Sequence, residues 1–228
     1  MAVGIPVLAV TDEIDPRIHS STVRERLGHV AFVIGCGDLP TGYLEFLADA
    51  LNKPVYFVLG NHVDELRRGA GRNDARKPLG AIDLGGRVIR DSQSGLILAG
   101  IPGSPRYGER EPAQYAEWEI WLMIARMAPQ LFWNRWRYGR ALDVLVTHAP
   151  PRHVGDREDH AHHGYEALRS FLRAFRPPVQ LHGHIHLYDR SVPSVHQFEQ
   201  TQVMNVFPYK VVDLAPAGVT ARQPESAS

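Results

Sequence analysis

The sequence predicts an α/β protein in which helices cover a parallel sheet, and three observations support this. Residues 3–10, 29–34 and 55–59 are short apolar runs with the composition of buried strands. Each run ends in a glycine or a polar turn. Residues 41–51, between the second and third runs, carry apolar side chains at helical spacing. A strand, helix and strand in this order indicate parallel pairing with a helical crossover.

The rest of the chain continues the alternation of strands and helices. Residues 87–90 and 96–99 flank a polar turn and predict a hairpin. Residues 113–137 predict a helix interrupted at Pro129, and this helix holds all four tryptophans. We expect these tryptophans to pack in the core, with an aromatic cap over the site or a partner surface as alternatives. The remaining predictions are a helix at 165–175 and strands at 142–146, 179–181, 203–206 and 211–214.

The composition is that of an ordinary globular protein, with 44% hydrophobic and 22% charged residues. Without an internal repeat or linker, we expect residues 1–215 to form one domain and residues 216–228 to form a flexible tail. The formal net charge is zero, which argues against attraction to nucleic acid or to an anionic membrane and disfavours a nuclease.

The compartment is predicted from two features. Cys36 is the single cysteine, which excludes an intrachain disulfide and suits a reducing environment. No apolar stretch approaches the roughly 20 residues that span a bilayer, and the first apolar run lacks the basic leader of a signal peptide. We therefore expect a cytoplasmic protein.

Residues of the kinds that bind metal ions follow the predicted strands. They are Asp12, Asp38, Asn61, His62, His148, His184 and His186. Because ligand-binding residues of parallel sheets collect at the carboxyl ends of the strands, we expect these side chains at one edge of one sheet.

The chemistry of this set predicts transition metals. His184 and His186 lie two residues apart, so both rings face the same way in an extended segment, and Gly183 permits close approach of the backbone. Mixed carboxylate and imidazole donors suit manganese, iron or zinc better than calcium or magnesium. Two such ions about 3.5–4 Å apart can clamp both oxygens of a phosphoryl displacement.

The chain resembles the calcineurin-like metallophosphoesterase family through five motifs in order. They are Asp12, Gly37-Asp38, Gly60-Asn61-His62, His148 and Gly183-His184-Ile185-His186. The resemblance spans residues 12–186. It implies a four-layer α-β-β-α sandwich whose active site lies at the carboxyl ends of the strands.

The resemblance also implies a role for each motif residue. Asp38 would bridge two divalent ions, and Asp12 and His186 would hold the first, with manganese preferred over iron or zinc. The second ion would be held by Asn61, His148 and His184. A water between the ions would attack phosphorus, and His62 would protonate the leaving oxygen as general acid. The implied activity is hydrolysis of a phosphate mono- or diester, with a nucleotide or another small phosphodiester preferred as substrate.

The chain departs from the family at two positions. Ile14 stands where the family has a histidine ligand, so we expect a weaker first metal site. Strand parity directs Glu13 away from that gap. Val63 replaces an acid that orients the general acid, and Asp64 is the nearest substitute. Because of Ile14, a non-catalytic interaction scaffold on the same fold remains the alternative function.

Two polar loops are candidates for substrate contact. The first follows His148 and contains His160, His162 and His163, of which we assign His162 and His163 to the substrate phosphate. The second follows His62 and is basic, and Arg67 is its candidate phosphate ligand. Both loops have a solvated surface as the alternative interpretation. The sequence does not predict the oligomeric state.

Overall fold

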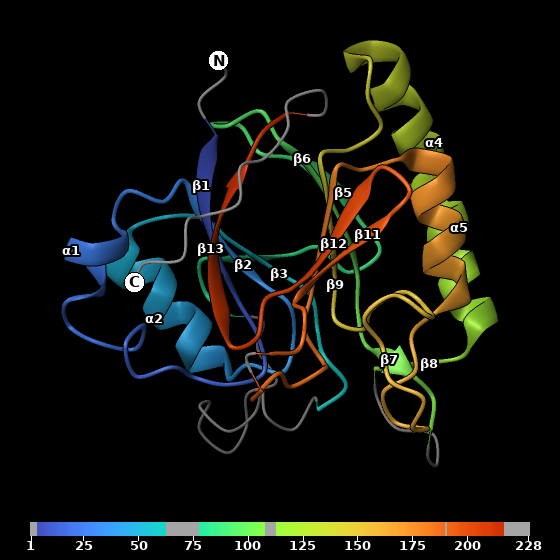
Figure 1. Cartoon of the computed structure of the whole chain (residues 1–228). Coiled ribbons are helices and arrows are strands. Elements are labelled where there is room, and N and C mark those ends of the chain that lie inside the picture. Colours follow the sequence, from blue (N-terminus) through green and yellow to red (C-terminus); the bar gives the residue numbers. More distant parts are fainter. Residues whose placement is uncertain (1–3, 63–77, 108–112, 190, 217–228) are drawn as a thin grey trace.

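Two β-sheets form the centre of the computed structural model, which describes residues 4–62, 78–107, 113–189 and 191–216 (Figure 1). The first sheet contains β1 (Ile5–Val10), β2 (Phe32–Gly35), β3 (Val55–Phe57), β4 (Ala81–Asp83) and β13 (Tyr209–Leu214). The second contains β5 (Val88–Arg90), β6 (Ile97–Ile101), β9 (Val144–Thr147), β10 (Val179–His182), β11 (Val195–Phe198) and β12 (Thr201–Asn205). A small parallel pair, β7 (Ser104–Pro105) and β8 (Gln114–Tyr115), lies outside both sheets.

Each sheet has a parallel centre. The order of the first sheet is β13-β1-β2-β3-β4, in which only the edge strand β13 runs antiparallel to its neighbour. The order of the second sheet is β11-β12-β10-β9-β6-β5, with β5 and β11 as antiparallel edges. The turns after the parallel strands therefore gather at one end of each sheet.

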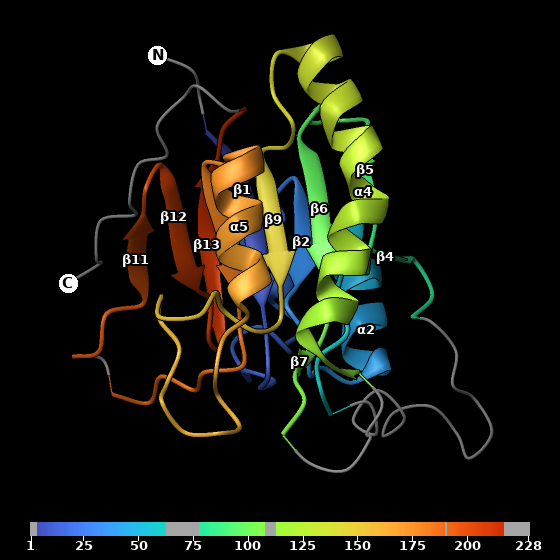
Figure 2. The same ribbon diagram turned by 90° about the vertical axis from the view of Figure 1, so that its right-hand side faces the viewer.

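Helices cover the outer faces of the two sheets, and the described ranges contain four of them (Figures 1 and 2). They are α1 (Val23–Leu27), α2 (Thr41–Leu51), α4 (Glu117–Tyr138) and α5 (Glu166–Phe175). The first two pack on the first sheet, and the last two on the second. The predicted four-layer α-β-β-α sandwich is confirmed. None of the helices in the described ranges has the length and apolar composition that a bilayer span requires.

The period of the strands explains the layers. In β1, Val7 and Ala9 point into the cluster that the two sheets share, whereas Leu8 and Val10 point toward the helices. Both faces of this strand are covered, so it has to be apolar throughout, as its sequence is. The apolar runs at 3–10, 29–34 and 55–59 are therefore inner strands of the first sheet, with a neighbour on either side.

Most predicted elements are confirmed, and the predicted hairpin is the antiparallel pair β5 and β6. The helix that contains Pro129 is not interrupted, because α4 runs unbroken from Glu117 to Tyr138. Pro129 lies on the exposed side of α4, between turns that are held by the buried Met127 and Leu131.

The expectation that the tryptophans pack in the core is wrong. The side chains of Trp118, Trp121, Trp133 and Trp136 are 65%, 46%, 51% and 80% exposed. The opposite face of α4 is the buried one. Its buried residues include Ile120, Ile124, Met127 and Leu131. The tail predicted at 216–228 lies, except for residue 216, outside the described residues.

Candidate metal centre

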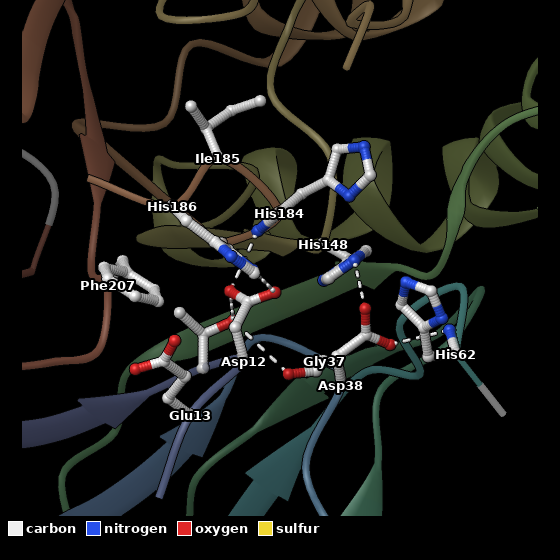
Figure 3. A network of polar contacts seen from close by, with 12 residues as sticks. Asp12, Glu13, Gly37, Asp38, His62, His148, His184, Ile185, His186 and Phe207 are labelled. Atoms are coloured by element: carbon white, nitrogen blue, oxygen red, sulfur yellow. Dashed lines mark hydrogen bonds and ion pairs between the residues drawn. The ribbon is translucent and has the colours of Figure 1, made fainter. Parts of the chain in front are cut away.

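The candidate ligands come from both sheets, not from one (Figure 3). The loops after β1, β2 and β3 of the first sheet supply oxygen donors, which are Asp12, Asp38 and Asn61. The loops after β9 and β10 of the second sheet supply imidazoles, which are His148, His184 and His186. The expectation of one edge of one sheet is therefore wrong, although the strand ends do meet.

Three of these side chains converge on one point. One ligand atom from each of Asp12, Asp38 and His148 lies within 4.8 Å of the other two. Nε2 of His148 is 3.1 Å from Oδ2 of Asp38 and 2.9 Å from Oδ1 of Asn61. Nε2 of His186 is 3.4 Å from Oδ1 of Asp12. The sequence-predicted oxygen and nitrogen donors thus face each other across the two sheets.

The hydrogen bonds of His148 indicate a position for a cation. Its Nδ1 donates to the carbonyl oxygen of Cys36 at 2.8 Å, so Nε2 is the nitrogen that faces the site. Nε2 lies within hydrogen-bond distance of oxygens of both Asp38 and Asn61. Three electron-rich atoms this close together are stabilised by a positive charge between them. Burial opposes charge on the ring, but the carboxylate of Asp38 outweighs burial and raises the pKa of His148 to about 9. A proton satisfies this arrangement, and so does a divalent metal ion.

His184 is held as a neutral imidazole. Its Nε2 donates to the carbonyl oxygen of Ala161 at 2.9 Å. Burial and the nearby charge of His148 lower the pKa of His184 to about 3, so the ring is neutral and Nδ1 keeps its lone pair. The rings of His148 and His184 lie 4.9 Å apart. The nitrogens with a free lone pair therefore differ in kind, and among the described residues the group of mutually close donors is Asp12, Asp38 and His148, without His184.

The two carboxylates are oriented by hydrogen-bond donors around them. Oδ2 of Asp12 accepts from the hydroxyl of Thr11 at 2.7 Å and from the backbone N–H of His184 at 3.0 Å. Oδ1 of Asp38 accepts from the backbone N–H of His62 at 2.8 Å. Burial disfavours ionisation of Asp38, but the charge and hydrogen bond of His148 outweigh it and lower the pKa of Asp38 to about 2. Both carboxylates are therefore ionised at neutral pH and available to a metal.

Two glycines permit the close approach of the ligand loops. A Cβ on Gly60 would lie 1.9 Å from Oδ1 of Asp38. A Cβ on Gly183 would lie 1.9 Å from Oγ1 of Thr11 and 2.6 Å from Oδ2 of Asp12. Any side chain at either position would displace a carboxylate that faces the site. The glycines in both motifs therefore serve the geometry of the site.

The backbone turns sharply at three ligand residues. Asp12, Asp38 and His184 have φ angles of 59°, 53° and 65°, in the left-handed region that side-chain-bearing residues seldom adopt. Such conformations are found preferentially at functional sites, where surrounding contacts maintain them. The turn at Asp12 also ends the alternation of side chains along β1.

Glu13 lies outside the group of Asp12, Asp38 and His148, and its carboxylate is directed away from these residues (Figure 3). The hydroxyl of Tyr188 donates to Oε1 of Glu13 and lies 3.4 Å from Nδ1 of His186. Glu13 therefore shares a hydrogen-bonded chain with His186. One face of the His186 ring is covered by an apolar side chain. The ring of Phe207 stacks on it, with 4.9 Å between the ring centroids. Ile14, which stands at the family's histidine position, is 39% exposed.

The remaining predicted site residues have different positions. His62 is exposed beside Asp38, and its ring is free of the ligand cluster (Figure 3). The ring of His162 lies 5.2 Å from that of His184 and is bonded through Nδ1 to Asp159 at 2.6 Å. His163 is directed to its own loop, where Nε2 donates to the carbonyl oxygen of Glu158. Val63, Asp64 and Arg67 lie outside the described residues.

Several residues that support the ligands were not predicted from the sequence. The amide nitrogen of Asn61 donates to the hydroxyl of Tyr107 at 3.1 Å, which turns its oxygen toward His148. Arg157 donates to the carbonyl oxygen of His186 at 3.0 Å. Thr11 could have been found, because it directly precedes Asp12 at a strand end. Tyr107 is 46 residues from Asn61, and no local pattern connects the two.

Comparisons with known proteins agree with this geometry. The sequence model described as calcineurin-like phosphoesterase matches residues 14–188, which begin two residues after Asp12. The crystal structure of TT1561 of Thermus thermophilus has the same fold, with a TM-score of 0.59 and 15% sequence identity over 90% of this chain and 89% of that one. A comparison with curated proteins gave no match.

Proposed function

Because the chain belongs to the calcineurin-like phosphoesterase family, we propose that it hydrolyses a phosphate mono- or diester at a pair of divalent transition-metal ions. One observation carries the proposal. Nε2 of His148 faces oxygens of both Asp38 and Asn61 while its Nδ1 is committed to the Cys36 carbonyl. This arrangement suits a cation at the point where the two sheets meet.

We propose that the candidate donors hold two ions, of which the group of Asp12, Asp38 and His148 supports the first contacts. We assign the bridging position to Asp38, whose two oxygens are directed to different neighbours, His148 and the His62 backbone. We assign Asp12 and His186 to the first ion. The second ion takes Asn61, His148 and His184. Oxygen and imidazole donors favour manganese, with iron or zinc as alternatives. When bound, the ions would stabilise the negative charge on the phosphoryl oxygens and lower the pKa of the attacking water.

The protein's own groups complete the reaction. His62 is exposed and next to Asp38, so its ring can reach a leaving oxygen and donate a proton to it. Of His162 and His163, we favour His162 for substrate contact. Its ring lies beside that of His184 and is oriented by Asp159. His163 and Arg67 stay as predictions from the sequence. The substrate we propose is a small phosphomonoester or phosphodiester, such as a nucleotide.

Two further proposals concern the whole chain. Residues 1–215 are taken as a single domain, supported by the apolar cluster that strands of both sheets share. A cytoplasmic location is supported by Cys36, which is buried and unpaired as expected in a reducing compartment.

The test is metal content by elemental analysis, combined with hydrolysis of an aryl phosphodiester and an aryl phosphomonoester while manganese is titrated. The matched control is Asp38→Asn, which keeps the shape of the side chain and removes the charge. Two metals per chain and manganese-dependent turnover, both lost in Asp38→Asn, would support the proposal. Absence of metal and of turnover at every manganese concentration would overturn it in favour of the interaction scaffold.

A further inference from the structure

The outward face of α4 carries a continuous apolar stripe. Its positions recur every three or four residues and fall within an arc of about 120° on the helix. We call it the α4 stripe, and it consists of Trp118, Trp121, Leu122, Ala125, Pro129, Phe132, Trp133 and Trp136. All eight residues are exposed, and Trp136 is 80% exposed. Figure 2 shows α4 on the outer side of the second sheet. The buried residues of α4 pack on that sheet, so the exposed stripe lies on the opposite face of the helix.

The area of the α4 stripe is that of an interface. Aromatic side chains bury about 150–250 Å² each, and the exposed fractions of the five aromatic residues leave roughly 450–750 Å² per chain uncovered. The largest apolar patch of a typical monomer covers about 300–600 Å². A stable interface of standard size buries about 800 Å² per partner. One partner that covers the whole length of α4 would bury this exposed apolar area.

The α4 stripe has the internal symmetry that a second copy requires. Its positions are arranged evenly on either side of Met127, with Ala125 and Pro129 nearest the middle. Trp118 and Trp136 stand at equal distances from Met127, at the two ends. In a two-fold interface each residue i contacts j of the partner while j contacts i. An antiparallel α4 pair would therefore place apolar residues of one copy against apolar residues of the other along the whole stripe.

The facing positions in such a pair follow from the helical geometry. Residues on the same flank and at mirrored heights would meet across the two-fold axis. The expected pairs are Trp118 with Trp136, Trp121 with Phe132, Leu122 with Trp133, and Ala125 with Pro129. The smallest side chains would then lie where the two helices cross, which allows their axes to approach, and the aromatic residues would fill the diverging ends.

The charges that border the α4 stripe favour the same arrangement. Glu117 and Glu119 stand in the first turn, and Arg135 and Arg137 stand in the last turn. An antiparallel copy would bring the acidic end of each helix to the basic end of its partner. Both acids already have a partner in their own chain, since Glu119 pairs with Arg106 and Glu117 accepts from the backbone N–H of Ala167, so their attraction to the partner's arginines acts at longer range. A parallel copy would place like charges together.

We propose that the α4 stripe is the interface of a homodimer, in which two copies of α4 pack antiparallel around a two-fold axis near Met127. A membrane surface is the competing occupant of an apolar helix face. Helices that lie on membranes carry a polar face rich in Lys and Arg. The flanks of the α4 stripe carry two acids at one end, two arginines at the other and Arg126 near the middle, and this mixture of both signs suits a second copy better.

The first test is sedimentation of the full chain from low to high micromolar concentration. We expect a dimer for the wild type, and we expect Trp118→Ser/Trp136→Ser to raise the dissociation constant by at least about tenfold. Circular dichroism checks that the variant is folded. The matched control is Leu79→Ser, which removes a side chain that is 68% exposed outside the α4 stripe and should leave the dimer intact. A wild type that is monomeric throughout, or a dimer that the double variant leaves unchanged, would overturn the proposal.

The second test separates the arrangements and the competing surface. Because the native Cys36 is buried, Trp118→Cys and Trp136→Cys each introduce one accessible thiol. After mild oxidation the antiparallel pair predicts a mixed disulfide when the two variants are combined, and no homodimeric disulfide from either alone. Homodimeric disulfides would contradict the antiparallel arrangement. A wild type that is monomeric and binds anionic phospholipid vesicles would overturn the dimer and identify the α4 stripe as a membrane-binding surface.

Discussion

The backbone N–H of His62 donates a hydrogen bond to Oδ1 of Asp38 at 2.8 Å, so the proposed general acid is joined to the proposed bridging carboxylate through the main chain. The imidazole takes no part in this contact. Orientation of Asp38 and proton donation by His62 can therefore be separated by mutation.

Replacement of His62 by alanine should leave metal binding intact and reduce turnover. The backbone donor to Asp38 is preserved, whereas loss of a general acid costs about 10²–10⁴ in rate. The effect should be larger for an alkyl phosphate than for a nitrophenyl ester, whose leaving group needs no proton. Metal content and kcat for both esters are the measurements, with His160→Ala in the neighbouring loop as the control. A loss of metal in His62→Ala would identify the ring as a ligand instead.

Introduction of a histidine at position 14 should strengthen the first metal site. Ile14 stands where the family has an imidazole ligand, and the ligands that we propose for the first ion are Asp12, Asp38 and His186. In Ile14→His, the manganese concentration for half-maximal activity should fall by at least about tenfold. Ile14→Leu is the control for a change of shape alone. An unchanged manganese midpoint would show that Glu13 or water already completes this site.

Replacement of Gly60 by alanine should weaken metal binding by displacing the Asp38 carboxylate. The added Cβ would lie 1.9 Å from Oδ1 of Asp38, so the carboxylate has to move and the His62 contact is broken. We expect lower metal content and lower activity in a folded protein. Gly42→Ala is the control, because a Cβ there meets no atom within 4 Å and lies in α2, where alanine favours the helix. Equal metal content in both variants would contradict the steric argument.

Asp91 should give the stability of the protein a dependence on acid pH. This carboxylate is 2% exposed and accepts from the Tyr56 hydroxyl at 2.7 Å and from the backbone and hydroxyl of Ser94, each at 2.6 Å. Burial opposes its ionisation, but these hydrogen bonds outweigh burial and hold the pKa of Asp91 below its usual value. Its contribution to stability is therefore fully present above the unfolded pKa of about 3.9 and is lost as the pH falls through the folded value.

Urea unfolding of the wild type and Asp91→Asn measures this contribution. Above about pH 5 the variant should be less stable by roughly 1–3 kcal/mol, because an amide cannot accept all three hydrogen bonds. The difference should shrink as the pH falls below about 4, where the wild-type carboxyl takes up its proton. A difference that is constant from neutral to acid pH would show that Asp91 acts through packing alone.

The sequence predicted the strands and their ligands because burial on both faces and the turns at strand ends leave strong local patterns. It could not assign strands to sheets, since the runs that became β2 and β9 are equally apolar and equally buried. The ordered pattern of Asp12, Asp38, His148 and His184 was visible. Their arrangement as oxygens from one sheet and nitrogens from the other was not.

The errors have local physical causes. The interruption expected at Pro129 does not occur, because the turns on either side of it in α4 are held by the buried Met127 and Leu131. The tryptophans of α4 were expected in the core, because apolar residues usually are buried. Both faces of this helix are apolar, and only the tertiary structure shows that Ile120 and Leu131 occupy the inner one.

The division of donors between the two sheets couples the fold to its ions. A cation held by Asp38 and His148 would join segments that are more than one hundred residues apart in the chain, one on each side of the shared apolar cluster. It would act as a reversible cross-link, and binding energy available only in the native state adds to the free energy of unfolding. A chelator should then lower the melting temperature as well as stop turnover, and the free energy of unfolding would rise with the concentration of free metal.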